Sequence, residues 1–190
     1  MENVSLNVFD EKLVRRVAKL YCQIWQEPPW NEFFWTVERV IADLRKELAL
    51  PNAVGFVCLN TIETIGFSWG YGVNQKQLEE ISGSNILDFL FEGQNKVFYI
   101  DELGIEKSYR QKGLGRQLTS AVIQQAKLFG TNRITLRTET EALAARQLYS
   151  SLGFKDLNLH DVNYPNRTYW LLETLKKIRI SAGDNRRIIL

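Results

Sequence analysis

Histidine and cysteine are scarce in this chain of 190 residues, which contains one histidine and two cysteines. A single histidine excludes most zinc sites and any histidine-based catalytic dyad that is not built around His160. Cys22 and Cys58 lack the CxxC spacing, which argues against a disulfide or metal framework. Both cysteines lie among apolar residues, so we expect small buried thiols and no bound metal.

Charge of one sign and long apolar runs are also missing. Lys and Arg number 24 against 22 Asp and Glu, and this balance disfavours nonspecific nucleic-acid binding. The longest apolar stretches, such as residues 86–91, fall short of the roughly 18 residues that a membrane span needs. The N-terminal sequence is unlike a signal peptide. We therefore expect a cytoplasmic protein with no nucleic-acid or membrane partner.

The composition and the absence of linkers indicate one domain. Hydrophobic residues make up 45% of the chain, enough for a full core, and no repeat or low-complexity tract divides it. We predict a single domain over residues 1–175 and a basic tail over residues 176–190. The basic residues of the tail are Lys176, Lys177, Arg179, Arg186 and Arg187.

Hydrophobic periodicity predicts a mixed α/β fold, with a central sheet of about seven strands flanked by helices. Asp10 is the expected cap of the first helix, and Gly83 interrupts a mixed segment that we interpret as a lid over a neighbouring surface. The predicted strands cover residues 4–9, 53–59, 64–73, 97–105, 133–138, 154–159 and 168–175; the helices cover 13–24, 37–48, 113–129 and 141–152; the mixed segment covers 76–91.

A glycine-containing turn follows the strand at residues 97–105 and opens the next helix. The first N–H groups of a helix have no intrahelical partner, and the helix dipole makes that end partly positive. Gly113 and Gly115 permit close approach of an anion, although the third glycine of GxGxxG is replaced by Leu118. The sequence therefore predicts a pyrophosphate site. The turn consists of Arg110, Gln111, Lys112, Gly113, Leu114, Gly115 and Arg116.

Two carboxylates, Asp101 and Glu102, interrupt the otherwise apolar strand that precedes this turn. Adjacent strand residues point to opposite faces unless a bulge intervenes. A buried carboxylate needs a partner, water or a chemical role, because desolvating its charge is costly. One interpretation is an ion pair near the end of the strand. The other is a cleft in which a carboxylate attracts an ammonium group or removes its proton.

Three segments, in this order and spacing, resemble the core motifs of the GNAT (Gcn5-related) N-acetyltransferases. They are Ile-Asp-Glu-Leu-Gly-Ile at residues 100–105, Tyr-Arg-Gln-Lys-Gly-Leu-Gly at 109–115, and Ala-Arg-Gln-Leu-Tyr-Ser-Ser-Leu-Gly-Phe at 145–154. The specific part of the resemblance covers residues 97–155.

The resemblance implies a splayed sheet that holds acetyl-CoA in a V-shaped opening, with no metal. The family's Arg/Gln-x-x-Gly-x-Gly/Ala segment falls on Arg110 to Gly115, so the main-chain amides from Gln111 to Arg116 would hold the pyrophosphate. Backbone groups of Leu103, Gly104 and Ile105 would pair with the pantetheine arm, and an amide at a bulge would stabilise the developing oxyanion. Tyr149 matches the tyrosine that protonates the departing thiolate, although it also fits an apolar helical stripe.

The expected reaction is direct attack of a primary amine of a small molecule or peptide on the acetyl thioester. Glu102, or water ordered near Asp101 and Glu102, would remove the proton from the amine. Acidic and aromatic residues favour a cationic acceptor, although core packing also explains aromatics. Besides the two strand carboxylates, these residues are Glu27, Glu32, Trp30, Phe33, Phe34, Trp35, Trp69 and Tyr71.

Some features leave alternatives open. Ala142 stands where many members of the family have asparagine, which keeps a noncatalytic acyl-CoA-binding module as one alternative. A dinucleotide-binding oxidoreductase is the second, with Glu139 as the ribose ligand, although the missing third glycine argues against it. We interpret His160 as a surface or structural residue in a loop. The apolar end at residues 188–190 extends a sheet edge, forms a homodimer contact or is a frayed terminus.

Overall fold

The computed structural model describes residues 4–61, 63–83 and 88–174. The predicted basic tail, the apolar end at residues 188–190 and the last residue of the final predicted strand lie outside this part of the chain.

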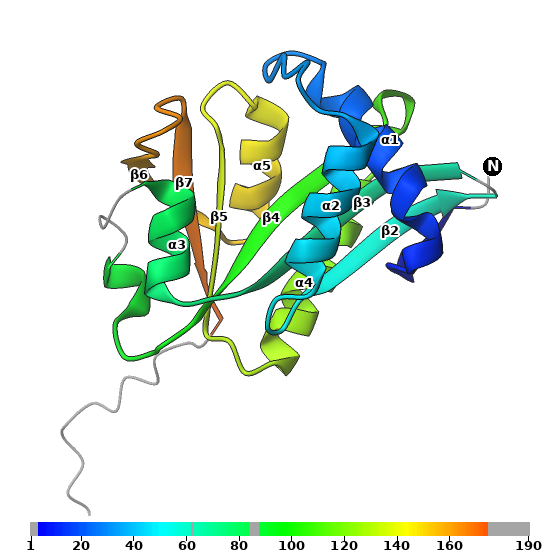
Figure 1. Cartoon of the computed structure of the whole chain (residues 1–190). Helices are drawn as coiled ribbons and strands as arrows, with labels where there is room; N and C mark the ends of the chain where they lie inside the picture. The colour runs from blue at the N-terminus through cyan, green and yellow to red at the C-terminus, as the bar shows by residue number, and fades with distance from the viewer. Residues whose placement is uncertain (1–3, 62, 84–87, 175–190) are drawn as a thin grey trace, which may run out of the picture.

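A seven-stranded mixed sheet runs through the molecule in the order β1-β2-β3-β4-β5-β7-β6 (Figure 1). Of its neighbouring pairs, β4 and β5 are parallel and the others are antiparallel, as the predicted hairpin and the predicted closing pair require. The predicted fold class is confirmed. The strands are β1 (Val4–Val8), β2 (Val54–Asn60), β3 (Glu63–Val73), β4 (Val97–Ile105), β5 (Arg133–Glu139), β6 (Lys155–His160) and β7 (Arg167–Glu173).

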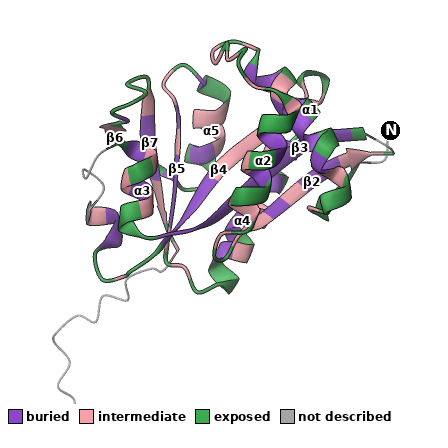
Figure 2. Cartoon of the chain, in the orientation of Figure 1, coloured by how far each residue is buried: buried purple, intermediate pink, exposed green. Residues whose placement is uncertain are grey.

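Helices cover both faces of the sheet. In Figure 1, α1, α2 and α3 lie on the near face and α4 lies on the far face. Residues of α5 share a core cluster with residues of α4. Figure 2 shows the buried residues gathered along the central strands. The helices are α1 (Val14–Trp25), α2 (Val37–Leu48), α3 (Gln75–Ser82), α4 (Leu114–Leu128) and α5 (Leu143–Ser151), with short 3-10 turns η1 (Glu11–Leu13), η2 (Asp88–Phe91) and η3 (Lys107–Tyr109).

Local capping explains where the helices begin. The carboxylate of Asp10 accepts a hydrogen bond from the Lys12 N–H at 2.8 Å, but the first turn it caps is η1 and not an α-helix. The helix predicted over residues 141–152 begins later, because the Thr140 N–H donates to the carbonyl of Asn166 and draws this segment into a turn.

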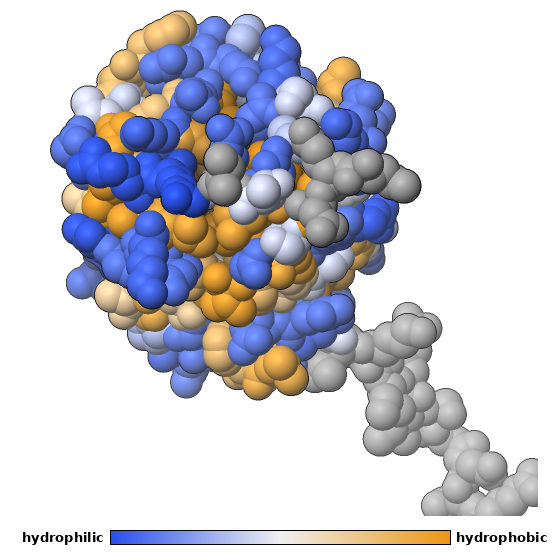
Figure 3. Space-filling view, turned by 90° about the vertical axis from the view of Figure 1, so that its right-hand side faces the viewer, coloured by the Kyte–Doolittle hydropathy of each residue, from blue (hydrophilic) through white to orange (hydrophobic). Residues whose placement is uncertain are grey.

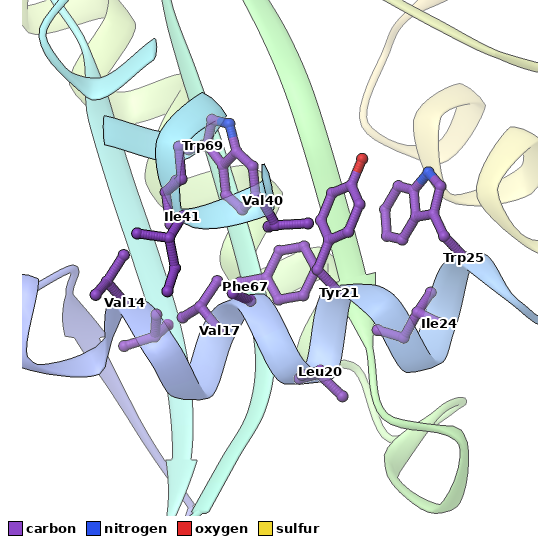
Figure 4. Packing of buried hydrophobic residues seen from close by; sticks show 13 residues of the cluster. Val14, Val17, Leu20, Tyr21, Ile24, Trp25, Val40, Ile41, Phe67 and Trp69 are labelled. Atoms are coloured by element: carbon purple, nitrogen blue, oxygen red, sulfur yellow. The ribbon is translucent and has the colours of Figure 1, made fainter. Parts of the chain in front are cut away.

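A cluster of apolar and aromatic side chains packs α1 and α2 against β3 (Figure 4). The rings of Tyr21 and Trp25 stack at 4.1 Å with 8° between their planes, and Phe67 stacks on Tyr21 at 6.0 Å. This packing fixes where the polar end of Tyr21 points. The two cysteines carry free thiols, and Cys58 is fully buried, which raises its pKa to about 11.

The mixed segment interpreted as a lid packs on the near face of the sheet. Leu78, Leu90 and Phe91 are buried in one cluster with residues of β3, β4 and β7. The guanidinium of Arg133 donates to the carbonyl oxygens of Phe89 and Leu90 at 2.6 and 3.1 Å. The apolar side chains therefore cover a neighbouring surface as expected, and movement of the segment stays a prediction.

Strand β4 is irregular in two ways that position the site. Trp69 pairs with Glu102 and Gly70 pairs with Ile100, so Asp101 is an extra residue that forms a β-bulge. Toward β5, β4 pairs only at Phe98 and Tyr99. Beyond these residues β4 and β5 diverge (Figure 1), and the edge of β4 toward β5 has no strand partner among the described residues.

Candidate active site

A pocket of about 440 Å³ lies on the α1 and α2 side of the sheet. Its walls come from α1, α2, the connection between them, the central strands and the turn between β6 and β7. Its volume is typical of a small-molecule site. Five acidic and three basic residues line it: Glu32, Asp43, Glu47, Asp101, Glu102, Arg39, Arg137 and Arg167.

The β-bulge brings both strand carboxylates into this pocket. The Tyr21 hydroxyl donates to Glu102 Oε1 at 3.0 Å, and the Tyr71 hydroxyl donates to Asp101 Oδ2 at 2.7 Å. In a regular strand these adjacent side chains would point to opposite faces. The bulge, which the sequence allowed but did not require, therefore places two carboxylates together.

Glu47 is a third carboxylate of the pocket, and the sequence analysis missed it. The Trp69 Nε1–H donates to Glu47 Oε2 at 2.7 Å. The position of Glu47 in α2 could have indicated this, because Glu47 follows the buried residues Val40 and Leu44 at helical spacing and therefore lies on the same face of the helix. An acid at the edge of an apolar helical face points to a pocket when the helix covers a sheet.

Burial and mutual repulsion hold protons on this carboxylate cluster, which we define as Glu47, Asp101 and Glu102. Burial, followed by the charge of Asp101, raises the pKa of Glu47 to about 8. Burial also raises the pKa of Asp101, and burial together with Asp101 and Glu47 raises the pKa of Glu102 well above its ordinary value. Within the described residues none of the three has a Lys or Arg partner at ion-pair distance. A cation that enters the pocket would therefore be attracted and would promote their ionisation.

Tyr149 lies in a core cluster with residues of α4, away from the α1 and α2 helices that line the pocket. Its ring packs edge-on against Phe154 at 5.9 Å, and only 7% of the residue is exposed. Burial, followed by the charge of Glu102, raises the pKa of its hydroxyl. This hydroxyl makes no hydrogen bond to a described residue, so it is available to a bound molecule.

The predicted phosphate turn has the backbone shape of an anion site. Gln111 and Gly113 have left-handed φ angles of 59° and 82°, and successive N–H groups in such turns form anion-binding concavities. Within the described chain, no backbone N–H from residue 111 to residue 116 donates a hydrogen bond. Apart from its chain neighbours, no described atom lies within 4 Å of where a Cβ of Gly113 would be, so the space beside this residue is open. A Cβ at Gly115 would instead lie 3.2 Å from Leu148 Cδ2, so packing gives this glycine a structural reason.

The side chains around this turn differ in their availability. The guanidinium of Arg110 is held by Glu27 at 2.7 Å and by the Ile105 carbonyl at 3.0 Å, so its charge is offset. Arg116 donates to Ser151 Oγ at 2.6 Å, and Lys112 Nζ lies 4.9 Å from the centroid of the Tyr109 ring. Among the described residues neither has an ion-pair partner, so these two supply the positive charge beside the turn.

Leu103, Gly104 and Ile105 lie on the part of β4 that has no strand partner toward β5. Each pairs with β3 on its other side. Gly104 also has a packing reason to be glycine, because a Cβ there would overlap the ring of Phe67. Its presence in the motif is therefore no evidence by itself for a ligand.

The remaining expected residues divide between the pocket and its surroundings. Phe34, Trp35, Trp69, Tyr71 and Glu32 line the pocket as expected. Trp30 instead stacks on Trp25, Phe33 is 70% exposed, and Glu27 pairs with Arg110.

His160 was expected in a loop, and that placement is wrong. It is the last residue of β6, because its backbone pairs with Thr168 of β7. Its Nδ1 lies 2.7 Å from the carbonyl oxygen of Pro165, and the residue is exposed outside the pocket. The interpretation of His160 as a structural surface residue agrees with this position.

Two further observations bear on the alternatives. Glu139 accepts a hydrogen bond from Arg167 Nε at 2.7 Å and is therefore committed to an ion pair. Together with the mixed sheet, this disfavours a dinucleotide-binding oxidoreductase. Ala142 is the N-cap of α5 and provides no side-chain hydrogen bond, so the asparagine of the family pattern has no substitute at this position.

Comparison with known proteins identifies relatives. Residues 15–154 match the acetyltransferase (GNAT) family. The chain is 28% identical to GCN5-related N-acetyltransferase 10, chloroplastic, of Arabidopsis thaliana over 156 residues, which are 78% of this chain and 60% of that protein.

Solved structures show the same fold. PH1933 from Pyrococcus horikoshii OT3 has a TM-score of 0.67 at 15% identity, covering 92% of this chain and 100% of that chain. The structure of yncA from Salmonella typhimurium with its cofactor acetyl-CoA has a TM-score of 0.63 at 15% identity, covering 97% of this chain and 99% of that chain. The family match extends over most of the described domain, and this chain belongs to the GNAT family of acetyltransferases.

Proposed function

We propose that this protein transfers an acetyl group from acetyl-CoA to a primary amine of a small molecule or peptide. The observation that carries the proposal is the placement of two features about β4. The backbone amides of residues 111–116, which donate no hydrogen bond within the described chain, follow the end of β4 that has no strand partner toward β5. The carboxylate cluster includes the two acidic residues at the bulge of the same strand. Family membership supports the same reaction.

The residues present fit a coenzyme. The backbone amides of residues 111–116 would hold the pyrophosphate, with charge from Lys112 and Arg116. Backbone groups of Leu103, Gly104 and Ile105 on the side of β4 that faces away from β3 would pair with the pantetheine arm, although the Ile105 carbonyl already accepts a hydrogen bond from Arg110. When bound, acetyl-CoA supplies an acyl thioester, and no metal is needed.

Proton transfer is assigned to Glu102 and Tyr149. An alkylamine is mostly protonated at pH 7 and must lose a proton before it becomes a nucleophile. The incoming ammonium group promotes ionisation of Glu102, which releases its own proton to solvent. The Glu102 carboxylate then accepts the proton from the ammonium group, and Asp101 supports the cation beside it. The unpaired hydroxyl of Tyr149 is the donor on the other side of β4, where a leaving thiolate would need a proton.

Substitution of these two groups tests the assignment. General acid and base groups contribute about 10² to 10⁴ in rate, so Glu102→Gln and Tyr149→Phe should each lower kcat by about 10² or more. Affinity for coenzyme A should stay within about threefold, because neither side chain belongs to the phosphate turn. Turnover is measured as thiol release from acetyl-CoA with a panel of amines, and affinity by calorimetry.

A matched control is Glu80→Gln, an exposed glutamate on α3 away from the pocket, which should leave turnover unchanged. Unchanged turnover in both test variants would remove the catalytic assignments. Coenzyme A binding without turnover of any amine would favour the noncatalytic acyl-CoA-binding module. The absence of a side-chain hydrogen bond from Ala142, the N-cap of α5, is the observation that favours this alternative.

None of the helices in the described ranges has the length and apolar content that a bilayer crossing requires. The edge strand β1 exposes Val4, Leu6 and Val8, and Figure 3 shows apolar surface bordered by polar side chains on the face that includes this edge. A cytoplasmic location and a homodimer both stay predictions.

A further inference from the structure

Arg167, the first residue of β7, connects two distant segments of the chain across the pocket. Its Nη2 donates to Glu32 Oε1 at 2.8 Å, and its Nε donates to Glu139 Oε1 at 2.7 Å. Glu32 belongs to the connection between α1 and α2, 135 residues earlier in the sequence. We name this arrangement of Glu32, Arg167 and Glu139 the clamp.

The clamp differs from an ordinary surface ion pair. The three side chains are only 14 to 16% exposed, so solvent screens them weakly. The guanidinium also lies 4.4 Å from the centroid of the Tyr164 ring. The second oxygen of Glu32 accepts a hydrogen bond from Trp35 Nε1 at 2.7 Å. Arg167 and Glu32 are therefore each held by more than one partner.

The clamp closes one side of the pocket. Glu32, Trp35, Tyr164 and Arg167 all line it, and they come from the two segments that Arg167 joins. Trp35 in turn packs edge-on against Tyr21 at 5.3 Å, and Tyr21 donates to Glu102. The wall is thus continuous from the clamp to the carboxylate proposed to accept the proton. A polypeptide acceptor needs an open path for the chain that follows its amino group, and the clamp obstructs this side.

The carboxyl groups of the pocket that lack a cationic partner favour a cationic ligand, because a cation promotes their ionisation. The basic lining residues are already paired: Arg167 with two carboxylates, Arg137 with Asp161 at 2.5 Å and Arg39 with Asp43 at 3.9 Å. Among the described residues, the donors to the carboxylate cluster from outside it are neutral: the hydroxyls of Tyr21 and Tyr71 and the indole of Trp69. The aromatic walls also suit methylene groups and cations.

Resting on the proposed function, we infer that Arg167 is a specificity-determining residue, which holds the pocket closed and restricts the acceptor to a small cationic amine. The pocket of about 440 Å³ has room for such a molecule. Opening the clamp should admit longer acceptors, because the connection between α1 and α2 would lose its link to β7.

The test compares 1,4-diaminobutane, butylamine and hexaalanine amide as acceptors. Wild-type kcat/KM should be at least 100-fold higher for the diamine than for the peptide, and higher for the diamine than for butylamine. In Arg167→Gln the ratio of kcat/KM for the diamine to kcat/KM for the peptide should fall at least tenfold. Glu32→Gln, which loosens the clamp but keeps the bond between Arg167 and Glu139, should change the ratio in the same direction if Arg167→Gln does not fold.

Arg146→Gln is the matched control. Arg146 also has an ion pair, with Asp156 at 2.7 Å, and lies 5.0 Å from the centroid of the Trp170 ring, but it is outside the pocket. Its ratio of diamine to peptide should equal that of the wild type. The inference would be overturned if Arg146→Gln and Arg167→Gln changed the ratio of kcat/KM for the diamine to kcat/KM for the peptide equally. It would also be overturned if the wild-type kcat/KM for the peptide were within tenfold of that for the diamine.

Binding separates this inference from the proposed function. Calorimetry of the coenzyme A-loaded protein should show binding of 1,4-diaminobutane and none of hexaalanine amide. Binding of the diamine without turnover would refute the proposed reaction. It would still support the inference that the pocket admits only small cationic ligands. If amines are acetylated and the affinity for hexaalanine amide equals that for 1,4-diaminobutane, the inferred role of Arg167 in specificity would be wrong. The proposed reaction would then still hold.

Discussion

Replacing Glu47 with glutamine should stabilise the protein, and the gain should increase with pH. Burial and the charge of Asp101 raise the pKa of Glu47 from 4.5 to about 8 in the folded state. Between these values the folded protein retains a proton that the unfolded chain releases. The folded state therefore binds more protons, and the free energy of unfolding falls as pH rises through this range. Glutamine has no proton to retain and still offers an oxygen to Trp69 Nε1.

The size of the effect follows from the two pKa values. One pKa unit corresponds to about 1.4 kcal/mol, so the shift penalises the wild-type fold by about 1 kcal/mol at pH 5 and about 4 kcal/mol at pH 8. Glu47→Gln removes this penalty. The difference in stability between variant and wild type should therefore grow by about 3 kcal/mol from pH 5 to pH 8.

Urea denaturation of both proteins at pH 5, 6, 7 and 8 measures this difference directly. Glu80→Gln makes the same chemical change at an exposed helical position and should show no such trend. A pH-independent difference, or a Glu47→Gln protein that is less stable than the wild type at pH 8, would refute the view that this carboxyl is buried without a cation.

Two further substitutions test the packing around the site. Gly70→Ala would place a methyl group 2.5 Å from the Tyr99 carbonyl oxygen and 2.6 Å from Phe98 Cε1, beside the β-bulge. The free energy of unfolding in urea denaturation should therefore fall by about 3 kcal/mol. A loss below about 1 kcal/mol would contradict this close packing. Leu90→Ala empties a fully buried position in the mixed segment and should cost about 2 to 5 kcal/mol. A cost near zero in the same assay would show that this segment does not pack on the sheet in solution.

Local patterns predicted the architecture well. Alternation over residues 97–105 and helical spacing after Gly113 predicted β4 and α4, and their order led to the mixed sheet. These predictions succeeded because burial on one or two faces imposes a period of 2 on strands and 3.6 on helices. The phosphate turn was equally visible, since its glycines and its neighbouring helix are adjacent in the sequence. The errors lay at helix ends and at His160, where distant backbone groups decide the boundary.

The sequence by itself determined the elements, the mixed sheet, the glycine-containing turn before α4 and the family of this protein. Only the tertiary structure decided that Asp101 and Glu102 share one pocket, because a bulge depends on how β3 and β4 pair. It also decided that Glu47 joins them and that Arg167 reaches Glu32, contacts between residues far apart in the chain. Electrostatic attraction and desolvation act through space and depend on distance and burial, which no local pattern records.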